Sequence, residues 1–153
     1  MKRVLLTVIM FMCLVGLVYA VGSITTTGPT KVSSHVYTIS YTWTGDASGN
    51  VTAAAGPAID GHVLFVVTDP GTTAPTDNYD LTLVDSDSVD VMGGELANRD
   101  TANSEQAMPK IGSSYGKRYV KGTLTLNVSN NTQASANGSV KVYIGTDAPL
   151  GFR

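Results

Sequence analysis

The sequence predicts an all-β protein, an antiparallel β-sandwich of jelly-roll or immunoglobulin-like topology that follows an N-terminal hydrophobic segment. Charged residues make up only 14% of the chain, and Thr, Ser, Gly, Val and Asn take their place, a mixture typical of short strands joined by turns. Apolar and polar residues alternate in several segments, which is the period of a half-buried strand. No helical period is seen after residue 20. These observations favour a sandwich and leave both topologies open.

The first 20 residues, MKRVLLTVIMFMCLVGLVYA, have the pattern of a secretory signal peptide. Two basic residues precede an apolar run, and small residues precede a cleavage point after Ala20. The run is shorter than the roughly 20 residues that span a bilayer. We therefore expect residues 1–20 to be a signal peptide or, if uncleaved, a hydrophobic helix that anchors the chain in a membrane. The single cysteine, Cys13, lies within this segment, so no disulfide framework is expected in the rest of the chain.

Residues 21–33 are rich in Thr, Ser and Gly and predict an extended arm or a first edge strand, and residues 34–153 are expected to form the sandwich domain. The segment from His35 to Thr44 alternates cleanly, which predicts a strand with one aromatic face toward the core. The residues on that face are His35, Tyr37, Ile39, Tyr41 and Trp43. A turn over residues 45–50 and a weak strand over residues 51–55 follow.

The segment from Gly61 to Thr68 contains five consecutive apolar residues, which predicts a central strand that is buried on both faces or lies at a sheet crossing. Residues 79–84 and 89–92 are expected to form a hairpin around the tight turn at residues 85–88. Residues 95–116 are polar with little periodicity, and loops of this length are usually functional or mobile. Strands over residues 119–128 and 139–144 complete a total of about seven.

The charge balance argues against nucleic acid and anionic membranes as partners. The whole chain has a net charge of −2, and loss of Lys2 and Arg3 with the leader would leave 8 basic and 12 acidic residues, a net charge of −4. A weakly acidic surface repels phosphate groups. Residues 1–20, if uncleaved, would be the expected route to a membrane.

Asp85, Asp87 and Asp90 are spaced as calcium ligands can be, because alternate aspartates present their carboxylates on one loop. An EF-hand loop would need Gly at its sixth position and Glu at its twelfth, where this chain has Asp90 and Leu96. We favour a turn in which the side chains cap their own backbone, and keep calcium as the alternative. No cofactor is expected.

No motif predicts an enzyme, because neither His35 nor His62 lies in a recognisable nucleophile or metal pattern. The polar segment over residues 95–116 and the residues that follow it are instead the first candidates for contact with a partner protein, since Tyr and Arg are favoured at interfaces. The candidate contact residues are Arg99, Tyr115, Arg118 and Tyr119.

The stretch from Gly61 to Glu105 contains APTDNYDLTL, then an acidic turn and VDV, then ANRDTANSE. In this pattern it resembles a module of small tailed-phage virion or virion-associated proteins. The resemblance covers about a third of the chain and includes no catalytic signature. It implies a non-enzymatic structural accessory protein of the virion, such as a capsid decoration or head-fibre component. Such a protein would dock on the major capsid protein or another virion protein, as a homo-oligomer.

The leader departs from this family, because typical phage virion proteins assemble in the host cytoplasm and need no export signal. An exported bacterial module is therefore the alternative: a surface or carbohydrate-binding domain that is secreted, periplasmic or attached to the cell surface.

Overall fold

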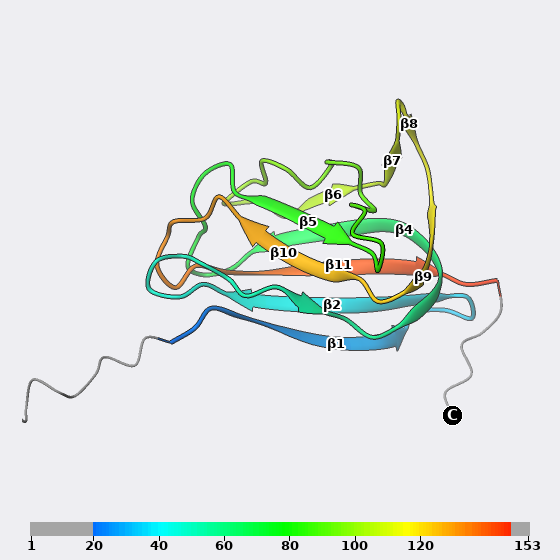
Figure 1. Cartoon of the computed structure of the whole chain (residues 1–153), viewed down its shortest axis with the longest axis horizontal. Helices are drawn as coiled ribbons and strands as arrows, with labels where there is room; N and C mark the ends of the chain where they lie inside the picture. Colours follow the sequence, from blue (N-terminus) through cyan, green and yellow to red (C-terminus); the bar gives the residue numbers. More distant parts are fainter. Residues whose placement is uncertain (1–19, 148–153) are drawn as a thin grey trace, which may run out of the picture.

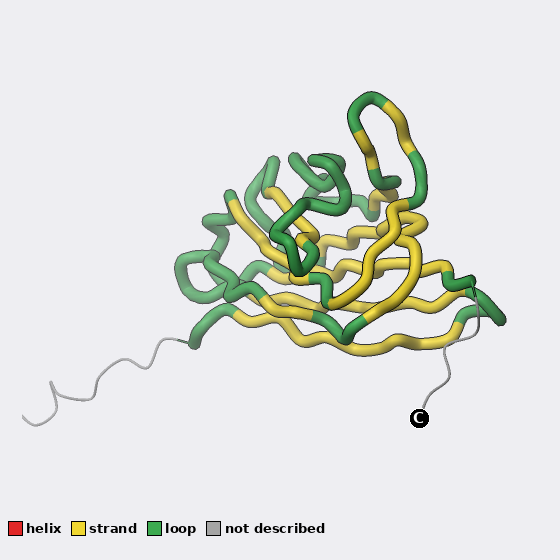
Figure 2. Tube along the Cα trace, turned by 45° about the vertical axis from the view of Figure 1, so that its right-hand side comes forward, coloured by secondary structure: helices red, strands yellow, loops and turns green. Residues whose placement is uncertain are grey.

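The computed structural model describes residues 20–147, so the expected leader over residues 1–20 lies almost wholly outside the described residues. The described part is all-β, contains no helix, and its paired strands are antiparallel (Figure 2). Within residues 20–147 there is no helix long and apolar enough to cross a membrane.

The largest sheet has the strand order β1-β2-β11-β4-β6, with β9 also paired to β4 (Figure 1). Its long strands lie side by side, and the chain returns at the end to place β11 between β2 and β4. The bounds of these strands are β1 (Ser23–Lys31), β2 (Val36–Thr44), β4 (Ile59–Pro70), β6 (Glu105–Ala107), β9 (Arg118–Gly122) and β11 (Asn137–Gly145).

A smaller sheet, β3-β10-β5, packs against one face of the large sheet, and a separate two-stranded hairpin projects from the body. The small sheet consists of β3 (Ala54–Ala55), β10 (Thr125–Ser129) and β5 (Asp80–Val84), and the hairpin consists of β7 (Lys110–Ile111) and β8 (Ser114–Tyr115). We call the face of the large sheet that is turned away from the small sheet the outer face.

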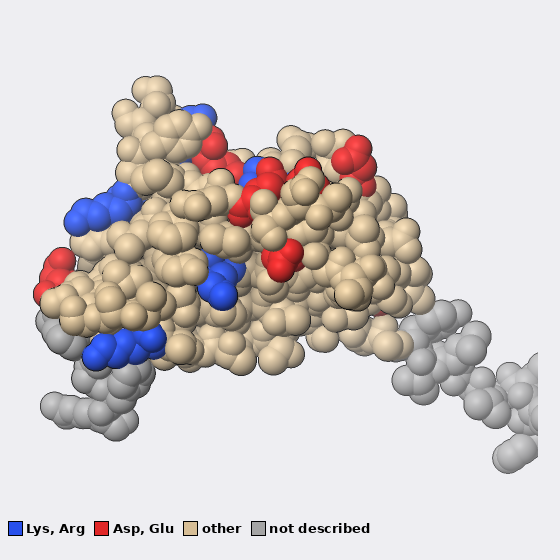
Figure 3. Space-filling model, turned by 180° about the vertical axis from the view of Figure 1, so that it is seen from behind, with Lys and Arg blue, Asp and Glu red and all other residues tan. Residues whose placement is uncertain are grey.

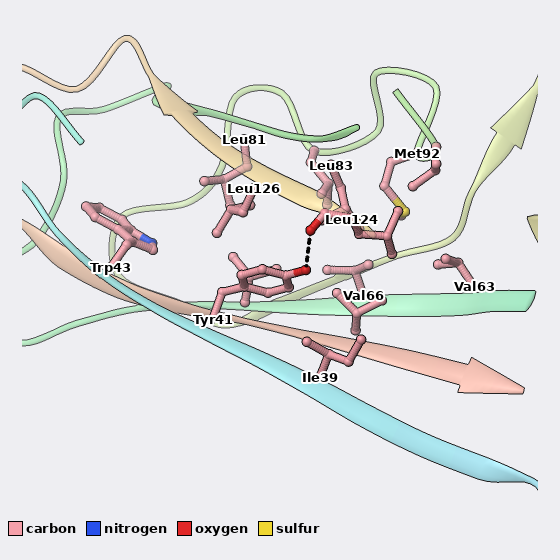
Figure 4. Packing of buried hydrophobic residues seen from close by; sticks show 14 of the residues in the cluster. Ile39, Tyr41, Trp43, Val63, Val66, Leu81, Leu83, Met92, Leu124 and Leu126 are labelled. Atoms are coloured by element: carbon pink, nitrogen blue, oxygen red, sulfur yellow. Dashed lines mark hydrogen bonds between the residues drawn. The ribbon is translucent and has the colours of Figure 1, made fainter. Parts of the chain in front are cut away.

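The hydrophobic core lies between the two sheets (Figure 4). Trp43, Tyr41 and Ile39 reach it from β2, and leucines of β5 and β10 meet them from the small sheet. The Tyr41 hydroxyl donates a hydrogen bond of 2.8 Å to the Leu124 carbonyl oxygen, which joins β2 to the start of the small sheet. Burial raises the pKa of Tyr41 well above its ordinary value, so the hydroxyl remains a donor.

The alternation predicted for β2 is confirmed over residues 37–43, since Tyr37, Ile39, Tyr41 and Trp43 are all buried. His35 is the exception: it is exposed and precedes the strand. Residues 23–31, within the segment expected as an arm, pair with β2 over almost their whole length. They form the edge strand of their own sheet rather than a free arm, and their bulge around Gly28 and Pro29 interrupts the pairing register.

Strand β4 is central in the sheet, but the expectation of burial on both faces is wrong. Val63 and Val66 point into the core, whereas Leu64, Phe65 and Val67 are only half-buried on the outer face. The register with β11 shifts by one residue between Val63 and Phe65, so the strand carries a bulge there. The bulge explains the unbroken apolar run, because two consecutive residues face outward and interrupt the alternation.

Two other local expectations are corrected. The strand expected over residues 119–128 is two strands in different sheets, separated at Gly122, whose φ of +119° is a conformation that other residues rarely adopt. The return strand expected over residues 89–92 is mostly turn, with one bridge between Val84 and Asp90. The polar segment over residues 95–116 contains the three short strands β6, β7 and β8.

Candidate protein-docking surface

The most prominent surface feature is the projecting hairpin, residues 108–116, which we call the finger (Figure 1). Ile111 pairs with Ser114 across a two-residue turn. Gly112 takes the first turn position with φ +61°, as tight hairpin turns of this kind require. The local sequence therefore forms a hairpin by turn chemistry, and few contacts outside the base hold it.

The base of the finger rests on the turn at residues 91–95. The Lys110 amide donates a hydrogen bond of 3.2 Å to the Met92 carbonyl oxygen. Within the finger, the Gly116 amide donates one of 3.0 Å to the Pro109 carbonyl oxygen, which joins its two strands at the base. Gly93 has a φ of +64°, and a Cβ there would lie 2.2 Å from the Lys110 carbonyl oxygen. Glycine at position 93 thus allows the finger to approach the body closely.

Glu95 connects the body to both strands of the finger. Its Oε1 lies 2.9 Å from Lys110 Nζ, and its Oε2 accepts a hydrogen bond of 3.1 Å from the Tyr115 hydroxyl. The ammonium group also lies 5.3 Å from the centre of the Tyr115 ring. The hydrogen bond from Lys110 lowers the pKa of Glu95, and the same bond raises the pKa of Lys110.

These pKa shifts define the pH range in which the contact holds. Because the folded-state pKa of Glu95 is lowered, its contribution is present above the ordinary pKa of glutamate, roughly 4.3, and is lost as the pH falls through the folded-state value. The pKa of Lys110 is raised, so its contribution is lost only at strongly alkaline pH. The finger is therefore fastened to the body at neutral pH.

The finger exposes apolar side chains to solvent. Ile111 is 58% exposed and Tyr115 is 59% exposed, and Met108 at the start of the finger is also exposed. Of the seven large hydrophobic side chains that are exposed in the described part of the chain, three lie on the finger: Met108, Ile111 and Tyr115. Clustered exposed apolar side chains of this kind mark protein contact sites more often than scattered ones do.

Basic groups lie at the base of the finger, and the view from behind shows basic side chains beside the base of the projection (Figure 3). Lys117 is exposed and makes no hydrogen bond or ion pair within the described residues. The Arg118 guanidinium is half-buried and donates one hydrogen bond, of 3.3 Å, to the Asp90 carbonyl oxygen. No carboxylate neutralises either group among the described residues.

The structure separates the four residues proposed from the sequence as partner contacts. Tyr115 lies on the finger and Arg118 at its base, whereas Tyr119 lies on the outer face, in edge contact with His62 at 5.4 Å between ring centres. The Tyr119 hydroxyl donates to Asp60 at 2.7 Å. Arg99 is largely buried, pairs with Glu105 at 3.5 Å and donates to the Ala97 carbonyl oxygen, so it holds the segment in place.

Two of the three proposed calcium ligands, Asp85 and Asp90, cap turns with their carboxylates. Asp85 accepts hydrogen bonds from the amides of Asp87 and Val89, and Asp90 accepts them from Met92 and Gly94. Asp87 is exposed. Among residues 20–147 no group of three or more His, Cys, Asp or Glu side chains is placed to hold a metal ion. The capping interpretation therefore describes this turn.

Sequence reasoning missed Met108 and Ile111 as contact candidates. The available signal was the pair Gly112-Ser113 between short segments that each carry an apolar residue, which is a hairpin pattern. The surrounding polar residues hid that pattern, because the hairpin is too short to show alternation.

No protein-family model, no curated protein and no solved structure matches this chain. Function is therefore inferred from the residues and their geometry.

Replacing Glu95 with glutamine is expected to loosen the finger at pH 7 without unfolding the body. The amide keeps the size of the side chain but removes the charge that attracts Lys110. Hydrogen-exchange protection at the amides of residues 108–116, corrected for the intrinsic exchange rate at each pH, should fall. The wild-type protein should lose protection in the same way as the pH drops through the lowered folded-state pKa of Glu95. Asp87→Asn is the matched control, since it neutralises an exposed carboxylate that takes part in no ion pair among the described residues. Unchanged exchange in Glu95→Gln would show that Glu95 does not hold the finger.

Proposed function

We propose that the chain is a non-enzymatic structural accessory protein of a virus, a capsid decoration, head-fibre or similar component of the virion surface. It acts by docking on the major capsid protein or another virion protein. The observation that carries the proposal is the finger, a preorganised projection (Figure 1) on which Ile111 and Tyr115 are exposed to solvent. A fastened projection loses little conformational entropy when it binds, which favours affinity.

The chemistry of the finger defines the kind of partner. Ile111 pairs with Ser114 and Tyr115 pairs with Lys110, so the two apolar side chains lie on opposite faces of the hairpin and would fit a groove that encloses the finger on both sides. Tyr is one of the residues that most often dominate binding energy. Lys117 and Arg118 at the base favour an acidic rim around that groove, because complementary charges steer association and fix orientation. We propose a homo-oligomer, since a symmetric assembly would present several fingers to a repeating capsid lattice.

The stretch that resembles virion proteins also supports the proposal. The residues of the phage-like stretch Gly61–Glu105 supply β4, β5 and much of the core, including Leu81, Leu83 and Leu96. The resemblance would thus concern the scaffold, while the finger follows it in the chain.

We also propose that the two facing sheets form a β-sandwich of jelly-roll or immunoglobulin-like kind, an architecture that closes one core between two sheets.

The finger can be tested with an Ile111→Asp variant in a sedimentation assay with purified virus particles. We expect the variant to bind at least tenfold more weakly than wild type, the effect of losing about 1.4 kcal/mol. Val32→Asp is the control, because Val32 is equally exposed on the turn between β1 and β2. Tyr115→Phe tests whether the ring suffices without the hydroxyl. Equal loss in Val32→Asp and Ile111→Asp would mean that the finger is not the docking element.

The alternative location, an exported protein that is secreted, periplasmic or on a cell surface, would place the same finger against an envelope protein. The leader pattern over residues 1–20 is the observation that favours it.

A further inference from the structure

A pocket of about 370 Å³ lies at the end of the molecule where β2 and β4 finish and β11 begins. It opens on the outer face, on the opposite side of the large sheet from the core, where the molecule presents a broad surface with few charged groups (Figure 3). Its volume falls within the roughly 300–1,000 Å³ of small-molecule sites. The lining residues are Thr42, Thr44, Asp69, Pro70, Gly71, Thr72, Asn137, Gly138 and Ser139.

The pocket is lined by hydrogen-bonding groups that the chain itself leaves unused. The hydroxyls of Thr42, Thr44 and Ser139 and the side-chain amide of Asn137 make no hydrogen bond within the described residues. The Asn137 amide oxygen packs against Gly71, where a Cβ would overlap it. Glycine at position 71 thus leaves room for the amide at the pocket wall.

Asp69 is the one charged residue of the lining. Its Oδ1 accepts a hydrogen bond of 3.0 Å from the Ser104 hydroxyl, and its Oδ2 has no partner within residues 20–147. A free carboxylate oxygen repels phosphate, sulfate and other carboxylates, and no basic side chain lines the pocket to offset it. The site therefore disfavours anions.

Strand pairing fixes the relative positions of these groups. Ser139 lies opposite Thr42 on one side and Asp69 on the other, and Asn137 lies opposite Thr44. Neighbouring strands are about 4.8 Å apart, so the three groups form a row across the sheet. Groups held on strands in this way need little rearrangement to bind a ligand.

We propose that this pocket binds a neutral saccharide. A sugar ring carries several hydroxyls that both donate and accept, which matches a wall of threonine and serine hydroxyls, one amide and one carboxylate oxygen. Its C–H groups can pack on Pro70, a half-buried residue of the lining. An apolar ligand would leave these polar groups unpaired, which is costly. The inference goes beyond docking at the finger and uses none of the same residues.

The test is an array of immobilised glycans probed with the purified chain. The array contains neutral glycans that end in glucose, galactose, mannose or N-acetylglucosamine, together with sialylated and sulfated ones. We expect binding to neutral glycans only. Titration calorimetry with the neutral glycan that gives the strongest signal should then show at least a tenfold loss for Asp69→Ala and for the double variant Thr42→Val, Thr44→Val.

Thr25→Val is the matched control, because Thr25 is an exposed threonine that lies opposite Thr42 on β1 but does not line the pocket. Thermal melting of each variant separates loss of binding from loss of folding. A blank array, a preference for the acidic glycans, or an equal loss in Thr25→Val would each overturn the proposal. None of these outcomes bears on docking at the finger, which is measured on virus particles.

Discussion

Replacing Trp43 with alanine is expected to lower the free energy of unfolding by about 3–5 kcal/mol. The side chain is fully buried, and its ring packs against the Tyr79 ring at 5.8 Å between centres. It also covers Gly138, where a Cβ would lie 2.9 Å from the indole ring. Truncation would leave a cavity between the two sheets that this rigid strand geometry cannot fill. Urea unfolding followed by circular dichroism measures the loss.

Trp43→Phe is the control for this prediction. Trp43 Nε1 is buried and has no hydrogen-bond partner in the described part of the chain, so phenylalanine removes volume and also an unsatisfied donor. We expect its cost to be clearly smaller than that of alanine. A cost below about 1 kcal/mol for Trp43→Ala would contradict the placement of this ring in the core.

Asn131→Ala is expected to cost about 2 kcal/mol, because the side chain joins three loops at one end of the molecule. Its Nδ2 donates to the Gly49 carbonyl oxygen at 2.8 Å, and its Oδ1 accepts from the amides of Thr76 at 3.0 Å and Gln133 at 3.3 Å. The residue is buried, so water replaces these bonds poorly. The measurement is again the unfolding midpoint in urea.

Gln133→Ala is the matched control. Gln133 is exposed and lies in the same loop, and its side-chain amide makes only one weak hydrogen bond, of 3.4 Å, to the Ala134 carbonyl oxygen. We expect it to change stability by less than about 0.5 kcal/mol. If both variants behaved alike, Asn131 would not hold the loops together. Loosening in Asn131→Ala should also reach the pocket, because Thr72 and Thr76 belong to one loop.

Features determined by neighbouring residues were predictable from the sequence. The alternation of β2 follows from the two-residue period of a strand, and Asp85 caps its own turn because its carboxylate reaches the amides two and four residues on. Features determined by pairing between distant segments could not be predicted from the sequence. The bulge of β4 depends on its register with β11, and a continuous apolar run hides it.

The same distinction applies to the two candidate sites. Tyr115 could be proposed from its residue type, but the fastening of the finger through Glu95 requires contact between residues 15 and 20 positions apart. The pocket could not be predicted, because Thr42, Asp69 and Ser139 come from three strands that meet only through the sheet register. Arg99 was proposed as a contact residue from its type alone, and its ion pair with Glu105 could not be foreseen, because that pair depends on how the chain folds back.

The most direct test of the proposed virion role is peptide mass spectrometry on density-purified virus particles, with culture supernatant and envelope fractions measured in parallel. We expect peptides from residues 21–153 to be enriched in the particles. A semi-tryptic peptide that begins at Val21 would show that the leader is cut. Peptides found only in the envelope or supernatant would contradict the virion role and leave an exported binding module in its place.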